Sequence, residues 1–388
     1  MYKILTLNNI SVTGLERLPR ESYEIASEIQ NPDAILLRSF NMHNWNVPTT
    51  VRAIGRAGAG VNNIPVDKMS TLGIPVFNAP GANANAVKEL VLAGMLMAAR
   101  NLAPAWEYVR GLTGTDEEIS KQVEAGKKQF VGFELTNRTL GVIGLGAIGV
   151  KVANAAQALG MKVIGYDPHI TVKNAWQLSS SVRQALSVED VLAHAEFVTL
   201  HVPLVDATRG IINAERLKHA NNRLTIMNFS RAGIVDLTAI AAAIKENKIH
   251  TYISDFPNNV LKGLDRVIAL PHLGASTQEA EENCAIMVAD QVRDYLEHGT
   301  IKNSVNFPEM EMPRTEGSYR LLVVNSNVPH MIERVSAAIS NANLNIVDML
   351  NRSRGDIACT LVDVNAELPT SVVDEIKTKE GVLAVLIL

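Results

Sequence analysis

Residues Thr139 to Gly149 read TLGVIGLGAIG, and the fold can be worked out from this stretch outward. Its first five residues form an apolar run typical of a strand, and Gly144, Gly146 and Gly149 follow with G-x-G-x-x-G spacing. The first glycine permits a tight turn, the second lets backbone approach a pyrophosphate, and the third lets the next helix pack on the strand. A helix expected over Val150–Leu159 would present its N-terminal N–H groups to that anion. The stretch therefore predicts a dinucleotide-binding α/β unit.

Asp167 closes the next apolar run, MKVIGY, eighteen residues past Gly149. An acid at this place can accept hydrogen bonds from the adenine-ribose hydroxyls and repels a 2′-phosphate. No arginine follows it directly, so we expect NAD rather than NADP. The alternative, a glycine-rich turn without a ligand, is disfavoured by the combination of strand, helix and acid.

Short apolar runs alternate with helical patterns along most of the chain. Several runs are apolar on both faces, as in a parallel sheet covered by helices on each side, and the alternation predicts doubly wound α/β architecture. A helical stretch around Ala86–Tyr108 and a charged segment around Asp116–Lys128 separate two sets, which predicts two α/β domains. The expected strands are Lys3–Leu7, Ala34–Leu37, Arg52–Ile54, Val76–Phe77, Thr139–Ile143, Lys162–Tyr166, Phe197–Leu200, Arg223–Asn228, Thr251–Ser254 and Val267–Leu270.

The composition changes after Val305. Asn306–Ser318 is rich in proline and glutamate and has little apolar periodicity, so it is predicted to be a linker. Tyr319–Leu388 then shows the order strand, helix, strand, strand, helix, strand. This βαββαβ order is the ferredoxin-like split unit.

Composition narrows the function classes. The 36 Lys and Arg residues against 40 Asp and Glu residues leave a formal charge of −4, without the basic excess of a nucleic-acid binder. Two cysteines, Cys284 and Cys359, provide no disulfide framework, which favours a reducing compartment. The longest uncharged apolar run, Leu90–Ala99, is too short for a membrane span, and no cluster has metal-ligand spacing. We expect a cytoplasmic enzyme without a metal or a membrane partner.

Three polar residues close strands of the nucleotide unit. Arg231 follows RLTIMNFS, Asp255 follows TYIS, and His272 follows VIALP. Ligands of open parallel sheets bind beyond the carboxyl ends of strands. A histidine can move a hydroxyl proton, and an arginine fork can hold a carboxylate. Each residue alone could be a surface cation, a turn cap or a loop histidine, but together they indicate an active site.

Six segments of the chain together form a specific family pattern: RAGAGVNNI, NAPGANANAVKEL, TLGVIGLGAIG, HVPLVDATRGIIN, NFSRAGIVD and PHLGASTQEA. Through them the sequence resembles the D-isomer-specific 2-hydroxy-acid dehydrogenase family over about residues 34–305. The resemblance implies a flavodoxin-like substrate domain (1–97 and 277–305), a Rossmann NAD-binding domain (98–276), a linker (306–318) and an ACT-like regulatory domain (319–388).

The resemblance also implies roles for single residues. Arg231 would bind the substrate carboxylate and carbonyl, His272 would be the general acid/base, and Asp255 would lie near the nicotinamide. The residues expected to hold the dinucleotide are Gly144, Gly146, Ala147, Ile148, Gly149, Asp167, Pro203, Thr208, Phe229 and Ser230.

Within the family, GRAGAGVNNI and PHLGASTQEAEEN are most similar to the branch that oxidises D-3-phosphoglycerate, the entry to serine synthesis. A phosphomonoester carries close to two negative charges, and Arg38, Arg56 and Lys127 are the cations we assign to it. The turns implied to face the substrate also contain Ser39, Ala57, Gly58, Asn78 and Asn83. For the arginines the alternative is ordinary strand-end charge, and for Lys127 it is a solvated helix end. The rival functions are a hydroxypyruvate or glyoxylate reductase and a non-catalytic NAD-sensing module.

Two departures from the family pattern stand out. A glutamate that pairs with the catalytic histidine is replaced by Asn258, Asn259 or Val260, and an amide supplies no charge. In the ACT-like unit, serine-binding members use a His and two Asn residues, whereas this chain has Asn325, Asn327 and Asn345. An amino-acid effector and a purely structural dimerisation module therefore both remain open. The resemblance further implies a homodimer or homotetramer.

Overall fold

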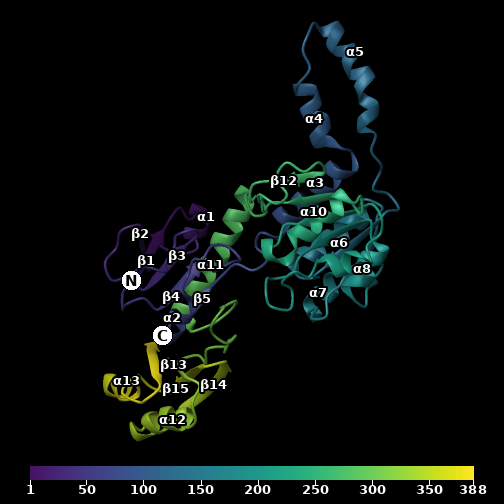
Figure 1. Cartoon of the computed structure of the whole chain (residues 1–388). Helices are drawn as coiled ribbons and strands as arrows, with labels where there is room; N and C mark the ends of the chain where they lie inside the picture. The colour runs from purple at the N-terminus through teal and green to yellow at the C-terminus, as the bar shows by residue number, and fades with distance from the viewer. The chain divides into compact units, whose positions relative to one another are not determined.

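Buried apolar strands build three sheets in the computed structural model, which describes all 388 residues. The chain divides into two units, Met1–Asn83 with Gln278–Leu388, and Ala84–Thr277 (Figure 1). The first division falls after Asn83 rather than after residue 97, because α3 (Ala84–Ala99) buries Val87, Val91 and Met95 in the core of the second unit. No helix combines the length and the apolar character needed to cross a membrane.

The second unit holds a seven-stranded parallel sheet of order β12-β11-β10-β9-β6-β7-β8. The order switches direction at β6, which has β7 on one side and β9 on the other. The strands are β6 (Thr139–Ile143), β7 (Lys162–Tyr166), β8 (Arg183–Gln184), β9 (Phe197–Leu200), β10 (Leu224–Asn228), β11 (Ile249–Ser254) and β12 (Val267–Ala269). Its remaining helices are α6 (Ala147–Ala158), α7 (Val172–Gln177), α8 (Val188–His194), α9 (Ala214–Leu217), η2 (Ala232–Ile234) and α10 (Leu237–Lys245).

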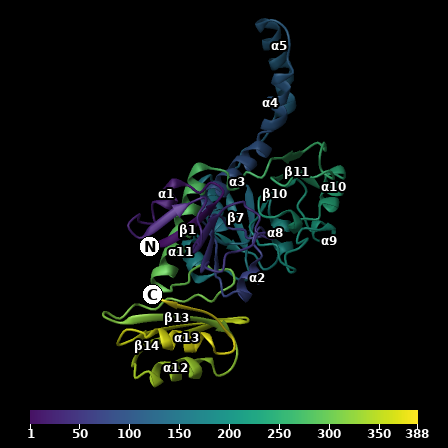
Figure 2. The same ribbon diagram turned by 90° about the vertical axis from the view of Figure 1, so that its left-hand side faces the viewer.

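Helices cover both faces of this sheet (Figures 1 and 2). One apolar cluster joins the strands to α8, α9 and α10, and another joins them to α3 and α6. Leu140 and Val142 of β6 belong to the second cluster, and Ile143 belongs to the first. A strand that is buried on both sides is the doubly wound arrangement that the sequence predicted, so the predicted fold class is confirmed.

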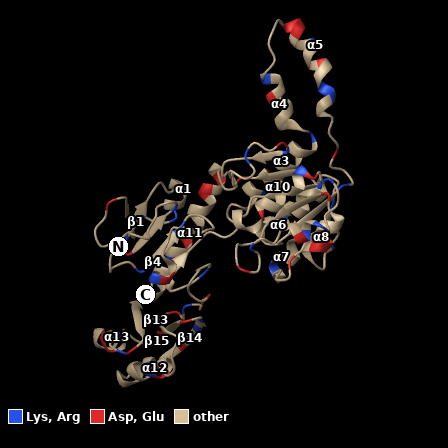
Figure 3. Cartoon of the chain, viewed as in Figure 1, with Lys and Arg blue, Asp and Glu red and all other residues tan.

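A helical arm extends from the same unit. The single helix expected over Ala86–Tyr108 is interrupted, because Asn101 adopts a left-handed conformation with φ of 50° between α3 and α4 (Leu102–Arg110). The charged segment forms α5 (Asp116–Gly126), and η1 (Lys127–Phe130) follows it. A capping box formed by Thr115 and Glu118 stabilises the N-terminus of α5. In Figure 3 the acidic first turn of α5 lies at the far end of the arm.

The first unit contains a five-stranded parallel sheet of order β2-β1-β3-β4-β5. This is the flavodoxin-like order, with a switch between β1 and β3. The long helix α11 (Gln278–His298) returns the chain to this sheet. The other elements are β1 (Tyr2–Leu7), α1 (Val12–Leu15), β2 (Tyr23–Ala26), β3 (Ala34–Leu37), β4 (Ala53–Arg56), α2 (Val66–Thr71) and β5 (Val76–Phe77).

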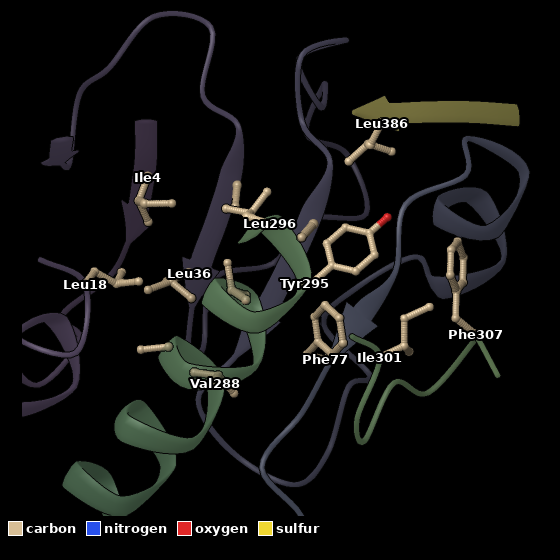
Figure 4. Packing of buried hydrophobic residues seen from close by; sticks show 14 of the residues in the cluster. Ile4, Leu18, Leu36, Phe77, Val288, Tyr295, Leu296, Ile301, Phe307 and Leu386 are labelled. Carbon is tan, nitrogen blue, oxygen red and sulfur yellow. The ribbon is translucent and has the colours of Figure 1, made fainter. Parts of the chain in front are cut away.

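The same unit ends in a four-stranded antiparallel sheet of order β14-β15-β13-β16, the ferredoxin-like arrangement. Its apolar core is continuous with that of the parallel sheet, and Figure 4 shows Tyr295 of α11 beside Leu386 of β16. The elements are β13 (Tyr319–Ser326), α12 (Met331–Asn341), β14 (Ile346–Arg354), β15 (Ile357–Val364), α13 (Thr370–Lys377) and β16 (Val382–Ile387).

A buried ion pair ties this C-terminal sheet to the preceding linker. Arg320 grips Asp363 through two hydrogen bonds of 2.6 and 2.8 Å and also donates to the carbonyls of Met312 and Pro313. Burial opposes ionisation of Asp363, but hydrogen bonds from Arg320 and the Thr315 N–H hold the pKa of this carboxyl below its ordinary value. Because each charge is paired and hydrogen-bonded, the pair can remain ionised in the core.

Candidate active site

The glycine turn has the geometry that its sequence predicted. Gly144 has φ of +93°, and a Cβ there would lie 2.5 Å from the carbonyl oxygen of His201. A Cβ on Gly149 would lie 1.9 Å from the carbonyl oxygen of Gly144, so only glycine lets α6 pack this closely. A Cβ on Gly146 would meet nothing within 4 Å. The packing of the protein thus requires glycine at positions 144 and 149. At Gly146 the absence of a side chain leaves open space beside the backbone.

The N-terminus of α6 adjoins this space. Gly146 occupies its N-cap position and offers no side chain to bind the first N–H groups. These N–H groups, beginning with those of Ala147 and Ile148, suit an anionic group. Asp167 follows β7 and accepts hydrogen bonds from the N–H groups of Leu145 and His169, both at 2.8 Å. The acid is therefore fixed against the glycine turn.

Arg231, Asp255 and His272 follow β10, β11 and β12, which are neighbours in the sheet. Because all the strands are parallel, their carboxyl ends lie at one edge, together with the Gly144 turn after β6. The structure thus brings the three strand-end residues to the same edge as the dinucleotide turn. This is the edge at which ligands of such sheets bind.

Arg231 stands on a turn that Asn228 organises. The Asn228 side chain accepts from the Ser230 N–H at 3.1 Å and donates to the Arg231 carbonyl at 2.9 Å. The Ser230 hydroxyl donates to the Leu200 carbonyl at 2.7 Å, which fastens the turn to β9. The Arg231 guanidinium is exposed and donates to the Ser230 carbonyl. A rigid backbone therefore carries a side chain that can still reorient toward an anion.

His272 is held through its neighbours. Its ring packs on Phe256, with centroids 5.0 Å apart, and the Gly274 N–H donates to Asp255 at 3.0 Å. Burial raises the pKa of the Asp255 carboxyl, while the Gly274 N–H and the His272 charge oppose that rise. Asn258 uses its side chain within its own turn, accepting from the Leu261 N–H. Asp255 is therefore the carboxylate that interacts electrostatically with the candidate acid/base.

Two buried polar atoms support a ligand at this edge. Asp255 Oδ1 and His201 Nδ1 are both buried and lack a hydrogen-bond partner within the protein. Burial lowers the pKa of His201 to about 3, and its other ring nitrogen bonds the Thr199 hydroxyl at 2.9 Å. Unpartnered buried polar atoms are costly unless something else satisfies them. The open space at Gly146 and these two atoms fit a dinucleotide.

The other predicted dinucleotide residues lie on the same strand ends. Thr208 donates its hydroxyl to the Pro203 carbonyl and accepts from the Val205 N–H, which closes the loop after β9. Phe229 is buried, and its ring edge would lie 3.4 Å from a Cβ on Gly94 of α3. These contacts hold the backbone after β9 and β10 in place at the carboxyl edge of the sheet.

The predicted phosphate cations of the first unit also lie on neighbouring strand ends. Arg38 follows β3 and Arg56 ends β4, and Arg56 Nε donates to the Arg38 carbonyl at 3.0 Å. A Cβ on Gly58 would lie 1.8 Å from Arg56 Nη1, so glycine makes room for the guanidinium. Arg38 pairs with Glu281 of α11 at 2.6 Å.

Several other predicted substrate residues surround these arginines. Asn78, after β5, donates to the Ala59 carbonyl at 2.7 Å, and the Ala79 N–H donates to the Gly58 carbonyl at 2.9 Å. The Ala57 N–H donates to the Leu37 carbonyl at 2.7 Å. Ser39 and Asn83 occupy the loops after β3 and before α3. The turns therefore support one another through backbone hydrogen bonds.

Lys127 stands apart from the strand-end residues of its own unit. It begins η1 on the helical arm and forms an exposed ion pair with Glu124. The structure does not bring it to the carboxyl edge of the seven-stranded sheet, and its assignment to a phosphate stays a prediction.

The candidate effector residues divide into two places. Asn325, Asn327 and His330 line a cavity of about 310 Å³ in the C-terminal sheet, where Asn325 Oδ1 is buried without a partner. Asn345 instead precedes β14 and pairs its backbone with Asn365. His330 adopts φ of +67°, a conformation that favours glycine.

Sequence reasoning missed three supporting residues. Asn228 organises the Arg231 turn, Phe256 packs on His272, and Glu281 pairs with Arg38. An Asn that ends a strand three residues before Arg231, with Ser230 two residues on, is a signal for an Asx turn, so Asn228 could have been found. Phe256 and Glu281 needed the tertiary structure.

The fold and the site define a dinucleotide-binding α/β protein whose ligand residues close parallel strands. Residues 92–274 match the family model described as D-isomer specific 2-hydroxyacid dehydrogenase, NAD binding domain. A D-3-phosphoglycerate dehydrogenase of Haemophilus influenzae is 33% identical over 343 residues, covering 85% of this chain and 80% of that protein. The chain belongs to the D-isomer specific 2-hydroxyacid dehydrogenase family, as the resemblance predicted, and the expected NAD-binding unit is confirmed.

Two further relatives extend the comparison. A D-3-phosphoglycerate dehydrogenase of Methanocaldococcus jannaschii is 38% identical over 296 residues, covering 74% of this chain and 54% of that protein. The chain thus spans about half the length of that relative. The solved NAD⁺-bound 3-phosphoglycerate dehydrogenase of Entamoeba histolytica aligns with a TM-score of 0.60 and 26% identity, covering 79% of this chain and 98% of that structure.

Proposed function

We propose that the chain catalyses the NAD-dependent oxidation of D-3-phosphoglycerate to 3-phosphohydroxypyruvate, the first step of serine synthesis. The observation that carries the proposal is the placement of Arg231, Asp255 and His272 on three adjacent strand ends beside the glycine turn. The names of the Haemophilus and Methanocaldococcus relatives support this substrate.

The chain's own residues would divide the chemistry as follows. His272 accepts the C2 hydroxyl proton as general base. Arg231 holds the substrate carboxylate with a guanidinium fork and polarises the adjacent C2 oxygen. Asp255, held by the Gly274 N–H, would help to position the loop that carries His272. Bound NAD supplies the acceptor for the C2 hydride.

Arg38 and Arg56 would bind the phosphate of the substrate. Their positions on neighbouring strands β3 and β4 concentrate positive charge at one edge of the five-stranded sheet. A dianionic phosphate needs such a pair, whereas an unphosphorylated hydroxy acid does not.

The test is the rate of NADH oxidation with 3-phosphohydroxypyruvate, hydroxypyruvate and 2-oxoglutarate. We expect kcat/KM to be highest for the phosphorylated substrate. Arg56→Ala should lower that value by about 10- to 100-fold, because charge-assisted hydrogen bonds are worth about 1.5–3 kcal/mol, and should barely change the rate with hydroxypyruvate. Arg17→Ala, an exposed arginine paired with Asp290, is the matched control. Equal kcat/KM for the phosphorylated and unphosphorylated substrates would refute the proposal.

One observation favours a second candidate, a hydroxypyruvate or glyoxylate reductase. Glu281 places a carboxylate 2.6 Å from Arg38 and offsets one of the two cations. In that case the unphosphorylated substrates would react fastest in the same assay, and Arg56→Ala would change little.

We also propose a cytoplasmic homodimer or homotetramer with an amino-acid effector at the C-terminal sheet. The arm exposes Trp106, Val109 and Val131, apolar side chains that suit burial against a second copy. The cavity lined by Asn325 and Asn327 offers amide groups to an effector. Sedimentation velocity tests the oligomer. Serine titration of the initial rate tests the effector, and an unchanged rate at millimolar serine leaves a purely structural module.

A further inference from the structure

A second cavity, of about 580 Å³, belongs to the first unit. It lies at the amino ends of the parallel strands, opposite to the carboxyl ends that carry Arg38 and Arg56. One wall consists of the residues at the starts of β3, β4 and β5, including Asp33, Arg52 and Ile74. The other wall consists of β16 and one face of α13, which contributes Val373 and Lys377. Its volume is in the range of small-molecule sites.

Opposite charges stand side by side on the first wall. Asp33 and Arg52 directly precede the neighbouring strands β3 and β4, and the backbone N–H of Arg52 donates to the Asp33 carbonyl at 2.7 Å, which extends the ladder by one pair. Arg52 Nε lies 3.5 Å from Asp33 Oδ1, longer than a normal hydrogen bond. The other Asp33 oxygen accepts from the Lys3 N–H at 2.9 Å, which fixes the carboxylate. Arg52 and Asp33 therefore do not satisfy each other fully, and each side chain can also bind a charged group of a ligand.

The second wall is largely apolar. Leu383 and Leu386 of β16 and Val373 of α13 line the cavity on this side, and Leu72 and Ile74 line it on the other. The walls meet where Gly73, with φ of +71°, would place a Cβ only 2.9 Å from the Leu383 Cβ. The cavity thus lies beside a tightly packed seam. The cavity opens to solvent past the exposed residues Thr49 and Thr50, so a small molecule can enter it, and it offers an ion pair on one side and apolar side chains on the other.

We propose that this cavity binds a free α-amino acid with a large apolar side chain. Arg52 receives the carboxylate, Asp33 receives the ammonium group, and the walls of β16 and α13 receive the side chain. Lys377, on the cavity rim, adds positive charge that favours the carboxylate. The ligand would join the parallel sheet to the C-terminal sheet at a place separate from the cavity of Asn325 and Asn327.

The test is isothermal titration calorimetry of the full chain with L-phenylalanine as the probe. Two analogues each lack one charge: 3-phenylpropanoate has no ammonium group, and L-phenylalaninamide has no carboxylate. We expect binding of L-phenylalanine and a loss of affinity of about tenfold or more for each analogue, as for a lost charge-assisted hydrogen bond. No binding of L-phenylalanine at about 5 mM, or equal binding of either analogue, would overturn the proposal.

Variants locate the ligand. Arg52→Gln should weaken binding by about tenfold or more, and thermal melting verifies that it folds. Thr49→Trp, at an exposed position of the cavity lining, should block binding without touching the core.

Lys377→Gln should weaken binding, whereas Lys379→Gln, on the same segment but outside the cavity and paired with Glu375, should not. Binding that survives Arg52→Gln and Thr49→Trp but is lost in Asn325→Ala would place the ligand in the other cavity and refute the proposal. Because calorimetry does not depend on turnover, these outcomes are independent of the proposed dehydrogenase activity.

Discussion

The two parallel sheets carry their candidate ligand residues at the same place, the carboxyl ends of adjacent strands, but build them differently. In the seven-stranded sheet the site depends on backbone shape: Gly144 and Gly149 have no room for a side chain, and Asp255 Oδ1 is buried without a partner. In the five-stranded sheet it depends on charge, because Arg38 and Arg56 are neighbours and Glu281 offsets one of them.

The two sites should therefore respond differently to mutation. Gly144 and Gly149 tolerate almost no substitution, since a Cβ at either position would meet a backbone carbonyl oxygen that cannot move cheaply. A site made of partly exposed charges can change its affinity for an anion through a single carboxylate. We therefore expect mutation to abolish NAD binding at the glycine turn abruptly and to weaken anion binding at the proposed phosphate site gradually.

The largest effect should come from the acid/base. Replacing His272 by alanine removes the proposed general base for the C2 hydroxyl proton, and we expect kcat to fall about 100- to 10,000-fold. Steady-state kinetics with 3-phosphohydroxypyruvate and NADH measures this. His194→Ala, an exposed helix-end histidine of the same unit, is the control and should keep full activity. A fall of less than about tenfold would show that another group moves the proton.

Substitutions of Gly149 and Gly146 test whether the site of the seven-stranded sheet depends on backbone shape. Gly149→Ala forces a Cβ against the Gly144 carbonyl oxygen, and we expect a loss of about 1–3 kcal/mol in the free energy of unfolding together with weaker NAD binding. Gly146→Ala meets nothing in the protein, so its melting temperature should stay unchanged while NAD affinity falls. Calorimetric NAD titration and thermal melting measure the two quantities. Unchanged NAD affinity in Gly146→Ala would mean that no ligand approaches that backbone.

A substitution of Glu281 tests whether the site of the five-stranded sheet depends on charge. Glu281→Gln releases Arg38 from its ion pair, and we expect the KM for 3-phosphohydroxypyruvate to fall by up to about fivefold, the range of an exposed pair. The KM for hydroxypyruvate should not change. A higher KM for the phosphorylated substrate would instead mean that Glu281 orients Arg38 for binding.

The smallest effect should come from Glu189, whose pair with Arg216 resembles that of Glu281 with Arg38. The N–O distances are 2.7 and 2.6 Å, and both pairs are partly exposed. The hydrogen bond from Arg216 lowers the pKa of Glu189 to about 2. Its stabilising contribution is therefore present above the unfolded pKa of about 4.3 and is lost as the pH falls toward 2.

Because this pair is exposed, Glu189→Gln should lower the free energy of unfolding by less than about 1 kcal/mol at neutral pH. The difference from the unsubstituted chain should shrink on acidification, and neither KM should change. Urea unfolding at several pH values measures the first quantity. An effect of Glu189→Gln on the KM of the phosphorylated substrate would remove the contrast with Glu281.

Much of the fold follows from local sequence patterns. Strands that are apolar on both faces, such as β3 and β9, were predicted within a residue or two, and so was the βαββαβ order of the C-terminal sheet. The strands β2 and β8 were missed, because β8 has only two exposed residues and β2 is only partly buried. The break between α3 and α4 was missed because the left-handed turn of Asn101 leaves no mark in the apolar periodicity.

The candidate site divides in the same way. Gly144, Gly149 and Asp167 could be predicted because their spacing along the chain determines their geometry. Glu281 could not, because it comes from a helix distant in sequence from Arg38 and the pairing exists only once the sheet has formed. The contact between Phe256 and His272 likewise depends on the packing of β11 and β12 side by side.

The most direct test of the account is the electron density of a crystal grown with NAD and D-3-phosphoglycerate. The account predicts that the Arg231 guanidinium binds the C1 carboxylate, that His272 lies within hydrogen-bond distance of the C2 oxygen, and that Arg38 and Arg56 contact the phosphate. Density in which Arg231 and His272 point away from the C2 oxygen would contradict it.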